Sequence, residues 1–105
     1  LGTNDYYAGI NAGSVSTNAA YYLRHVQEIY PDVPITVISP FGNIPADFNA
    51  AIGSVAQTAG CHYIDGTTLL SRTASSWSKD NVHPNTTGFN EITAAFTPIL
   101  QQQLG

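Results

Sequence analysis

The order of helix and strand patterns predicts an α/β protein with a parallel sheet. Helical patterns alternate with short apolar strand patterns along the 105 residues, as is typical of βαβ units with right-handed crossovers. The segment 34–41 has a β-branched run bounded by prolines, which favours a strand buried on both faces of a parallel sheet. We therefore expect a three-layer α/β/α, flavodoxin-like arrangement.

Residues 1–5 are predicted to contain the end of a buried strand and the start of a loop. The stretch 6–17 is rich in small and polar residues, which favours a loop. Residues 16–18 are candidate caps for a helix over 19–30, where apolar residues recur at helical spacing. Pro31 ends this helix, because the residue before a proline avoids helical geometry.

The second helix has the clearest pattern. Between Phe48 and Ala59, apolar residues recur at i, i+3, i+4, i+7, i+8 and i+11. Gly60 follows at a position that suits a left-handed C-cap. A short strand is then expected at 62–65.

The C-terminal third combines a polar stretch with one more helix. Residues 66–86 are irregular, and a turn of helix is expected at 68–71. The last helix carries an apolar face formed by Phe89, Ile92, Phe96, Ile99 and Leu100. Pro98 lies inside that helix and predicts a kink, because proline removes one backbone hydrogen bond.

Two complete strands and one strand end make a poor free-standing sheet, because an edge and an apolar face would stay uncovered. We therefore expect residues 1–105 to be a single C-terminal portion of a doubly wound domain, a fragment whose earlier strands precede Leu1. An isolated fragment could also cover its open edge by forming an oligomer.

Composition argues against several classes of function. The chain is 43% hydrophobic and 10% charged, with a net charge of −4 and only three cations, so no nucleic-acid partner is expected. No apolar run approaches the roughly 18–20 residues that cross a bilayer, so no membrane partner is expected. The three histidines lack metal-ligand spacing, and neither a metal nor another cofactor is expected: they are His25, His62 and His83.

Low charge, few lysines and the sequon Asn85-Thr86-Thr87 favour a secreted, extracellular protein. We expect the sequon to be unused, because a glycan on Asn85 would lie close to His83. Cys61 is the one cysteine. It is either a free thiol that packs as a small hydrophobe or a cysteine whose disulfide partner lies outside this chain.

Two polar clusters lie where strands or loops meet the predicted sheet edge. Asn4-Asp5 follows the first strand, and Asp80-Asn81-Val82-His83-Pro84 precedes the last helix; ligands of open parallel sheets collect at such loops. In a bent loop the Asp80 carboxylate can reach Nδ1 of His83, and a histidine held in this way is a good general base. Taken separately, each cluster also fits ordinary turn chemistry or a loop salt bridge.

Taken together, the clusters resemble the SGNH (GDSL-like) hydrolase superfamily. The third block of that family is Gly-x-Asn-Asp and the fifth is Asp-x-x-His-Pro, and this chain has both in the same order, at 2–5 and 80–84. The resemblance implies that His83 is the catalytic base and that Asp80 orients it. It also implies that the side-chain amide of Asn4 is an oxyanion-hole donor, and that Gly2 lets the backbone approach the substrate.

The stretches LGTNDYY, EIYPDVPITVISPF and DNVHPNTTGF are similar in texture to secreted carbohydrate esterases of this superfamily, such as acetylxylan esterases. The resemblance implies a hydrolase that cleaves a carboxylic ester, with an O-acetyl group on a polysaccharide as the candidate substrate. Tyr6 and Trp77 are candidates for the wall of the substrate pocket, and each suits a packing role equally well.

The first and second blocks of the family are not found in this sequence. They supply the nucleophilic Ser, in a Gly-Asp-Ser context, and an oxyanion-hole Gly, and both would precede Leu1. Ser39 ends a predicted strand, but no serine here lies in a Gly-Asp-Ser or nucleophile-elbow context. We expect the Ser to come from a missing N-terminal half, joined to this chain or present as a second chain.

The alternative is a non-catalytic binding or interaction fragment on the same scaffold, for which the tyrosines and polar residues would suit sugar binding. In the enzyme, Nε2 of His83 would face a cleft shared with Asn4; in the binding module, His83 would be buried or turned away.

Overall fold

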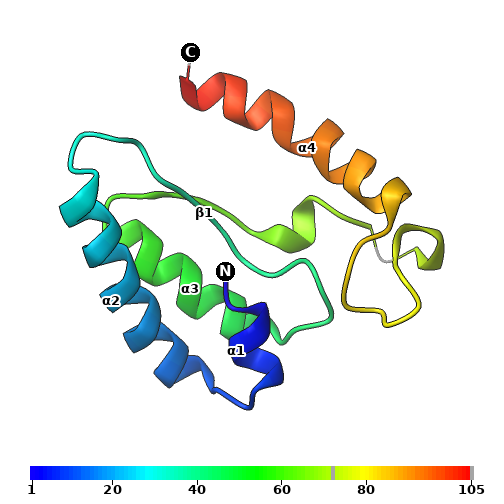
Figure 1. Cartoon of the computed structure of the whole chain (residues 1–105), viewed down its shortest axis with the longest axis horizontal. Coiled ribbons are helices and arrows are strands. Elements are labelled where there is room, and N and C mark those ends of the chain that lie inside the picture. The colour runs from blue at the N-terminus through cyan, green and yellow to red at the C-terminus, as the bar shows by residue number, and fades with distance from the viewer. Residues whose placement is uncertain (72, 105) are drawn as a thin grey trace. The chain divides into compact units, whose positions relative to one another are not determined.

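The computed structural model describes the backbone of residues 1–71 and 73–104 and shows helices alternating with two short strands (Figure 1). The elements group into two compact units. Unit 1 comprises residues 1–40 and 44–65, and unit 2 comprises 41–43 and the chain from Gly66 onward. Each unit is described on its own.

Unit 1 contains a parallel sheet and three helices. The strands β1 (Thr36–Ile38) and β2 (His62–Ile64) pair in parallel, with Val37 opposite Tyr63. The predicted α/β class with a parallel sheet is therefore confirmed. In chain order the elements of unit 1 are α1 (Thr3–Tyr7), α2 (Ala12–Ile29), β1 (Thr36–Ile38), α3 (Ala46–Thr58) and β2 (His62–Ile64).

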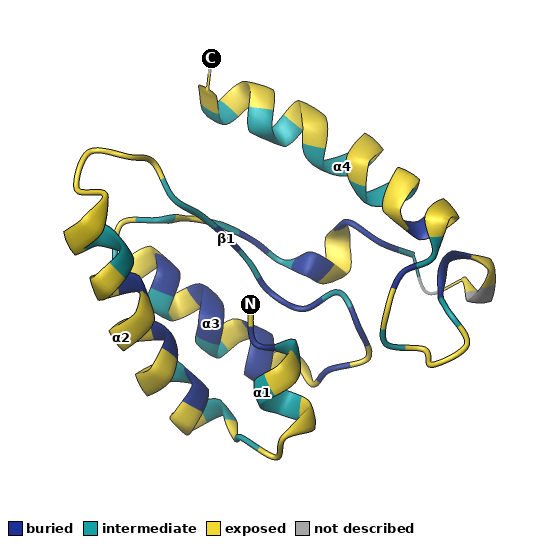
Figure 2. Cartoon of the chain, viewed as in Figure 1, coloured by how far each residue is buried: buried dark blue, intermediate teal, exposed yellow. Residues whose placement is uncertain are grey.

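The core of unit 1 lies where α2 and α3 meet the sheet, as the buried stripes along both helices show (Figure 2). Ile52 and Ala56 on α3 are completely buried, as the predicted stripe requires. Gly60 has φ of 76°, so the predicted left-handed residue follows α3. The cluster consists of Val15, Leu23, Val37, Ile44, Phe48, Ile52 and Ala56.

The predicted start of α2 is wrong by several residues. The helix begins at Ala12, because the side chain of Asn11 accepts the N–H of Ser14 and caps it. Residues 12–17, which suggested a loop, are helical here, and Val15 among them is buried in the core. The predicted strand end at residues 1–5 is also wrong, because residues 1–2 are not in a strand and α1 forms from Thr3. The start of the loop predicted at 6–17 is helical for the same reason.

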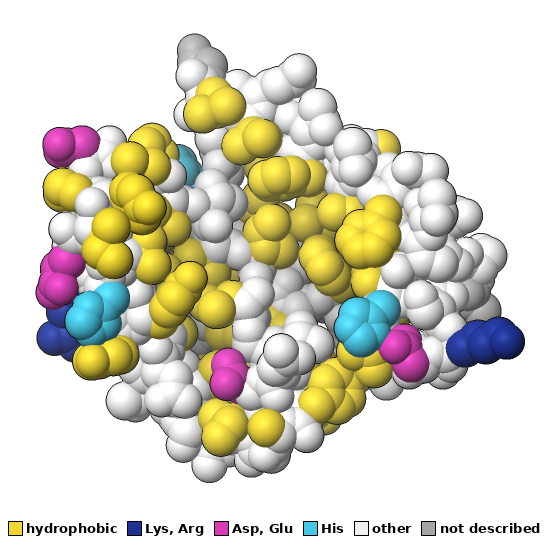
Figure 3. All heavy atoms as spheres, in the orientation of Figure 1, with side chains coloured by type: hydrophobic (Ala, Val, Ile, Leu, Met, Phe, Trp, Pro, Cys, Tyr) yellow, Lys and Arg dark blue, Asp and Glu magenta, His cyan; other side chains and the backbone are white. Residues whose placement is uncertain are grey.

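One side of α2 stays uncovered. Hydrophobic side chains gather over this helix on the left of Figure 3, and Tyr21, Tyr22 and Ile29 are all more than half exposed. Beside it, residues of α2 and β1 line an open groove of about 340 Å³. This is the bare apolar face expected of a sheet with few strands.

Unit 2 is built around α4 (Thr86–Leu104), which continues through Pro98. Two short 3₁₀ turns, η1 (Gly66–Thr68) and η2 (Ala74–Ser76), precede it, in place of the single turn expected at 68–71. The predicted apolar face of α4 is half-buried except for Phe89, which is 56% exposed. No helix in the described part of the chain combines the length and hydropathy needed to cross a membrane.

Candidate active site

Asp80 and His83 meet across a tight turn that precedes α4. The N–H of Ser78 donates to the His83 carbonyl at 2.8 Å, and the N–H of Asn81 donates to the Ser78 carbonyl at 3.0 Å. Asn81 has φ of 58°, a left-handed conformation that asparagine tolerates better than most residues. The turn therefore reverses the chain between Ser78 and His83.

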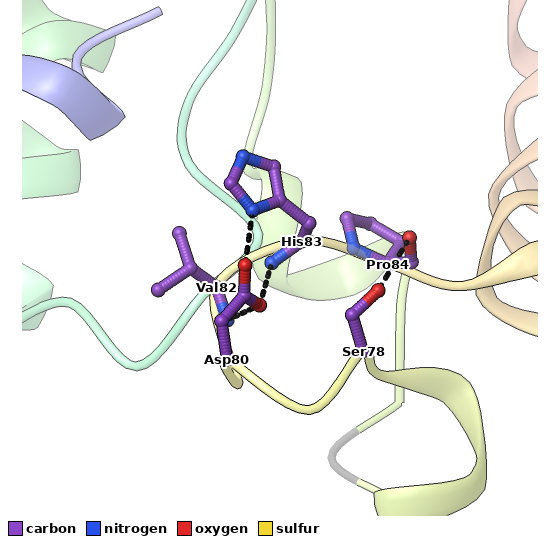
Figure 4. Close-up of polar contacts among 5 residues, drawn as sticks. All are labelled: Ser78, Asp80, Val82, His83 and Pro84. Carbon is purple, nitrogen blue, oxygen red and sulfur yellow. Dashed lines mark hydrogen bonds and ion pairs between the residues drawn. The ribbon is translucent and has the colours of Figure 1, made fainter.

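The Asp80 carboxylate is held by groups of Val82 and His83 (Figure 4). Its Oδ1 accepts the backbone N–H groups of Val82 at 2.9 Å and His83 at 3.0 Å. Its Oδ2 lies 2.6 Å from Nδ1 of the His83 ring. An ionised carboxylate can only accept hydrogen bonds, so Nδ1 carries the proton and Nε2 of the neutral ring is left as the acceptor.

The same contacts control the charge of Asp80. The backbone N–H of His83, the His83 ring and then the N–H of Val82 hold the pKa of the Asp80 carboxyl well below its usual range. The carboxylate therefore stays ionised through the neutral and mildly acidic range. The side chains of His83 and Asp80 are 75% and 49% exposed, and water screens such a pair. The contact fixes the ring's orientation more than it stabilises the fold.

The base of the turn is pinned by Trp77. Trp77 forms an isolated bridge with Pro84, and its indole N–H donates to the Ser71 carbonyl at 3.0 Å. The ring is only 8% exposed. In this unit Trp77 is a packing anchor of the loop, and its part in a substrate pocket stays a prediction.

The other predicted site segment begins at Gly2 in unit 1. Gly2 has φ of 102°, and a Cβ there would lie 2.6 Å from Cδ1 of Ile52 and 3.1 Å from Cε1 of Phe48. A side chain at Gly2 would therefore be strained by its backbone conformation and crowded by Ile52 and Phe48 in the core, a contact that the sequence did not reveal. The approach of the Gly2 backbone to a substrate stays a separate prediction.

Asn4 lies on α1 and is exposed. Together with its neighbours in residues 1–5 it lines an open hollow of about 340 Å³. Tyr6 packs edge-on against Phe48, with ring centroids 5.5 Å apart, and is half-buried. Asn4 and Tyr6 belong to unit 1, whereas Asp80 and His83 belong to unit 2. The structure thus brings Asp80 to His83, and membership of Asn4 in the same site stays a prediction.

The family model of the GDSL-like lipases and acylhydrolases matches residues 1–90. The chain belongs to the GDSL-like lipase/acylhydrolase family. No curated protein and no solved structure gave a significant match. Both motifs of this GDSL-like chain, at 2–5 and 80–84, lie within the matched range.

Asn85 has a structural role that the sequence analysis missed. Its side-chain N–H groups donate to the carbonyls of Ser75 at 2.7 Å and Trp77 at 3.1 Å, and its Oδ1 accepts the N–H of Gly88. The signal was available, because Asn is a preferred cap immediately before a helix. These bonds occupy the amide that a glycan would modify, which supports the prediction that the sequon is unused; intact mass would test it.

The remaining candidates are placed as follows. Ser39 of this GDSL-like chain is 1% exposed and accepts a hydrogen bond from the Tyr63 hydroxyl at 3.0 Å, so it is not presented as an attacking group. Cys61 is a half-buried free thiol whose pKa burial raises. His25 and His62 are exposed. Within the described residues, no cluster of His, Cys, Asp or Glu could hold a metal ion.

Proposed function

We propose that this chain is part of an SGNH-type serine esterase and supplies its acid–base pair. His83 is the general base, Asp80 orients it, and Asn4 donates to the oxyanion. The observation that carries the proposal is the 2.6 Å contact between Oδ2 of Asp80 and Nδ1 of His83. That contact leaves Nε2 of an exposed ring free of the carboxylate and able to accept a proton.

The reaction follows from these roles. Nε2 of His83 takes the proton of a serine hydroxyl as its oxygen attacks the ester carbonyl. The imidazolium that forms lies beside the ionised Asp80, and it then protonates the departing alcohol. Water, deprotonated by the same ring, releases the acid from the acyl-enzyme and restores the serine.

Asn4 is proposed to stabilise the oxyanion through its side-chain amide. Asn4 is exposed and borders an open hollow, so a small ester could reach the amide. Loss of one oxyanion donor typically lowers kcat by roughly 10²–10³-fold. Asn4→Ala should therefore cost less than the loss of the base.

The attacking serine is proposed to come from polypeptide outside residues 1–105, joined to this chain or associated with it as a second chain. The burial of Ser39 supports this, because a serine that is 1% exposed cannot meet a substrate without rearrangement.

The substrate is proposed to be a carboxylic ester, namely an O-acetyl group on a polysaccharide, and the protein is proposed to be secreted. The sequence texture and the scarcity of charge support a neutral, extracellular substrate: only 10% of residues are charged. Tyr6 and Trp77 are proposed to contact the sugar. No cofactor or metal is part of the proposal.

A fluorophosphonate serine-hydrolase probe tests the proposal directly. After labelling, the sample is denatured and its intact masses are measured. An adduct on polypeptide outside this 11.2 kDa segment, together with ester hydrolysis that disappears in His83→Ala, supports the two-part site. The matched control is His25→Ala, because His25 is also exposed and lies 3.6 Å from a carboxylate, that of Glu28. A reactive serine without dependence on His83 contradicts the proposal, and no labelling at all favours the binding fragment.

A further inference from the structure

Glu91 links α4 to the loop that precedes the Asp80–His83 turn. It is half-buried on α4. Its Oε1 accepts the backbone N–H of Ser71 at 2.7 Å. Its Oε2 accepts the hydroxyls of Ser76 at 2.8 Å and Ser71 at 3.2 Å. One carboxylate therefore ties two points of the loop, 15 and 20 residues away in sequence, to a single position on the helix.

The charge of Glu91 is suited to this position. The Ser76 hydroxyl, then the N–H and hydroxyl of Ser71, lower the pKa of the Glu91 carboxyl. Hydrogen bonds to an ionised acceptor are roughly twice as strong as those between neutral groups. The loop is thus held by charge-assisted bonds at neutral pH.

The anchored serines connect directly to the base of the catalytic turn. Ser71 accepts the indole N–H of Trp77 through its carbonyl, and Ser76 accepts the N–H of Asn85 at 3.1 Å. Trp77 follows Ser76 in the chain and bridges Pro84, the neighbour of His83. A shift of Ser71 and Ser76 would therefore be passed to both ends of the turn.

In the described part of unit 2, the turn is largely exposed. Its tip, residues 79–81, is exposed, and the side chain of His83 is 75% exposed. The Asp80–His83 contact and the internal turn bonds set its shape, but they do not fix its position on α4. That position is set at the base, where Trp77, Asn85 and the loop held by Glu91 converge.

We propose that Glu91 is a positioning residue for the Asp80–His83 pair, acting through Ser71 and Ser76. The inference rests on the proposed function, because it assigns Glu91 a task in the same site. Glu91 itself does not touch the substrate in this role. Its removal should loosen the pair before it unfolds the unit.

The first test reads His83 without any catalysis. In the ¹⁵N-labelled chain, NMR of the imidazole nitrogens gives the fraction of His83 that is protonated on Nδ1, with His62 as the internal reference. In Glu91→Ala we expect this fraction to fall clearly towards that of the exposed His62. Glu28→Ala is the matched control, because Glu28 is the other glutamate of the chain and is 3.6 Å from His25; it should leave His83 unchanged.

Two further variants separate positioning from simple loss of structure. Glu91→Gln keeps the shape and one acceptor oxygen, so it should restore most of the His83 signal. Ser76→Ala removes one hydroxyl donor and should reproduce part of the loss. A folded Glu91→Ala whose His83 signal matches wild type overturns the proposal. If Glu91→Ala does not fold, an unchanged His83 signal in Ser76→Ala overturns it instead.

The second test uses ester hydrolysis by the complete protein. Misplacement of a catalytic group by about 1 Å can cost roughly 10²-fold, so Glu91→Ala should lower kcat by roughly 10- to 100-fold with KM nearly unchanged. A change in KM alone would count against positioning of the base. If His83→Ala leaves hydrolysis unchanged, the proposed function fails, and the NMR comparison still decides whether Glu91 positions the pair.

Discussion

The two units of this chain are stabilised by different means. Unit 1 is organised around an apolar cluster in which Ile52 and Ala56 are completely buried. In the described part of unit 2, the loop before α4 contains the buried apolar side chains Leu69, Leu70 and Trp77, whereas α4 contributes only Gly88 as a buried residue. Polar bonds to Asn85 and Glu91 hold the same loop. Unit 1 therefore depends on an apolar cluster between helices and sheet, whereas unit 2 combines a few buried loop side chains with polar bonds that hold a turn in place.

The largest effect is expected at the Asp80–His83 pair. In the complete protein, His83→Ala or Asp80→Asn should lower kcat/KM for p-nitrophenyl acetate by roughly 10³–10⁴-fold, because the base or its correct tautomer is lost. The melting temperature should barely change, since both side chains are well exposed. Steady-state kinetics and thermal unfolding of the same samples make the comparison. Activity that survives in both variants would remove the pair from the chemistry.

The largest effect on stability is expected in the core of unit 1. Ile52→Ala should lower the free energy of unfolding by about 2–5 kcal/mol, because it leaves a cavity at a completely buried position. Ile29→Ala is the matched control, since Ile29 is 67% exposed, and its effect should stay within about 0.5 kcal/mol. Urea unfolding followed by circular dichroism measures both. Equal effects would show that the apolar cluster does not dominate unit 1.

The features predicted correctly from sequence are those encoded locally. The stripe of α3 and the left-handed Gly60 depend on neighbours a few positions apart. Asp80 and His83 are three residues apart, and their contact needs only a bent loop. Such features can be predicted from the local sequence without knowledge of the rest of the fold.

The features missed from sequence depend on contacts between distant residues. Gly2 is constrained by Phe48 and Ile52, about fifty positions away on α3. Glu91 bonds to Ser71 and Ser76. Nothing in the local sequence around these residues indicates that they pair. The helical start of α2 was hidden because its small and polar residues suggested a loop, and only the Asn11 cap and the burial of Val15 mark it as a helix.

A smaller effect on stability is expected at Gly2 and Gly9, where it separates backbone strain from crowding of the side chain against the core. Gly2→Ala and Gly9→Ala both place a side chain at positive φ, of 102° and 87°, which should cost about 1–2 kcal/mol each. Only Gly2→Ala also forces a Cβ against Ile52, whereas nothing lies within 4 Å of the Cβ at Gly9. Overpacking should add about 1–3 kcal/mol. Urea unfolding should therefore rank Gly2→Ala as the more destabilised, and equal values would mean that the core yields at this point.

The smallest effect is a dependence on pH confined to unit 2. The pKa of Glu91 is lowered by its serine donors, so its stabilising bonds are fully present above the usual carboxyl value of 4.5 and are lost as pH falls through the lower value of the folded protein. Trp77 is the one tryptophan of the chain and is buried near these bonds. Its fluorescence should shift to the red on acidification below about pH 4.5, before the apolar cluster of unit 1 unfolds.

The red shift of Trp77 should be smaller in Glu91→Gln. This variant carries no titrating carboxyl at position 91, so its contacts with the serines do not change with pH. A shift of equal size in wild type and Glu91→Gln would assign the acid response to other carboxyls of the chain and would remove Glu91 from the polar framework that distinguishes unit 2.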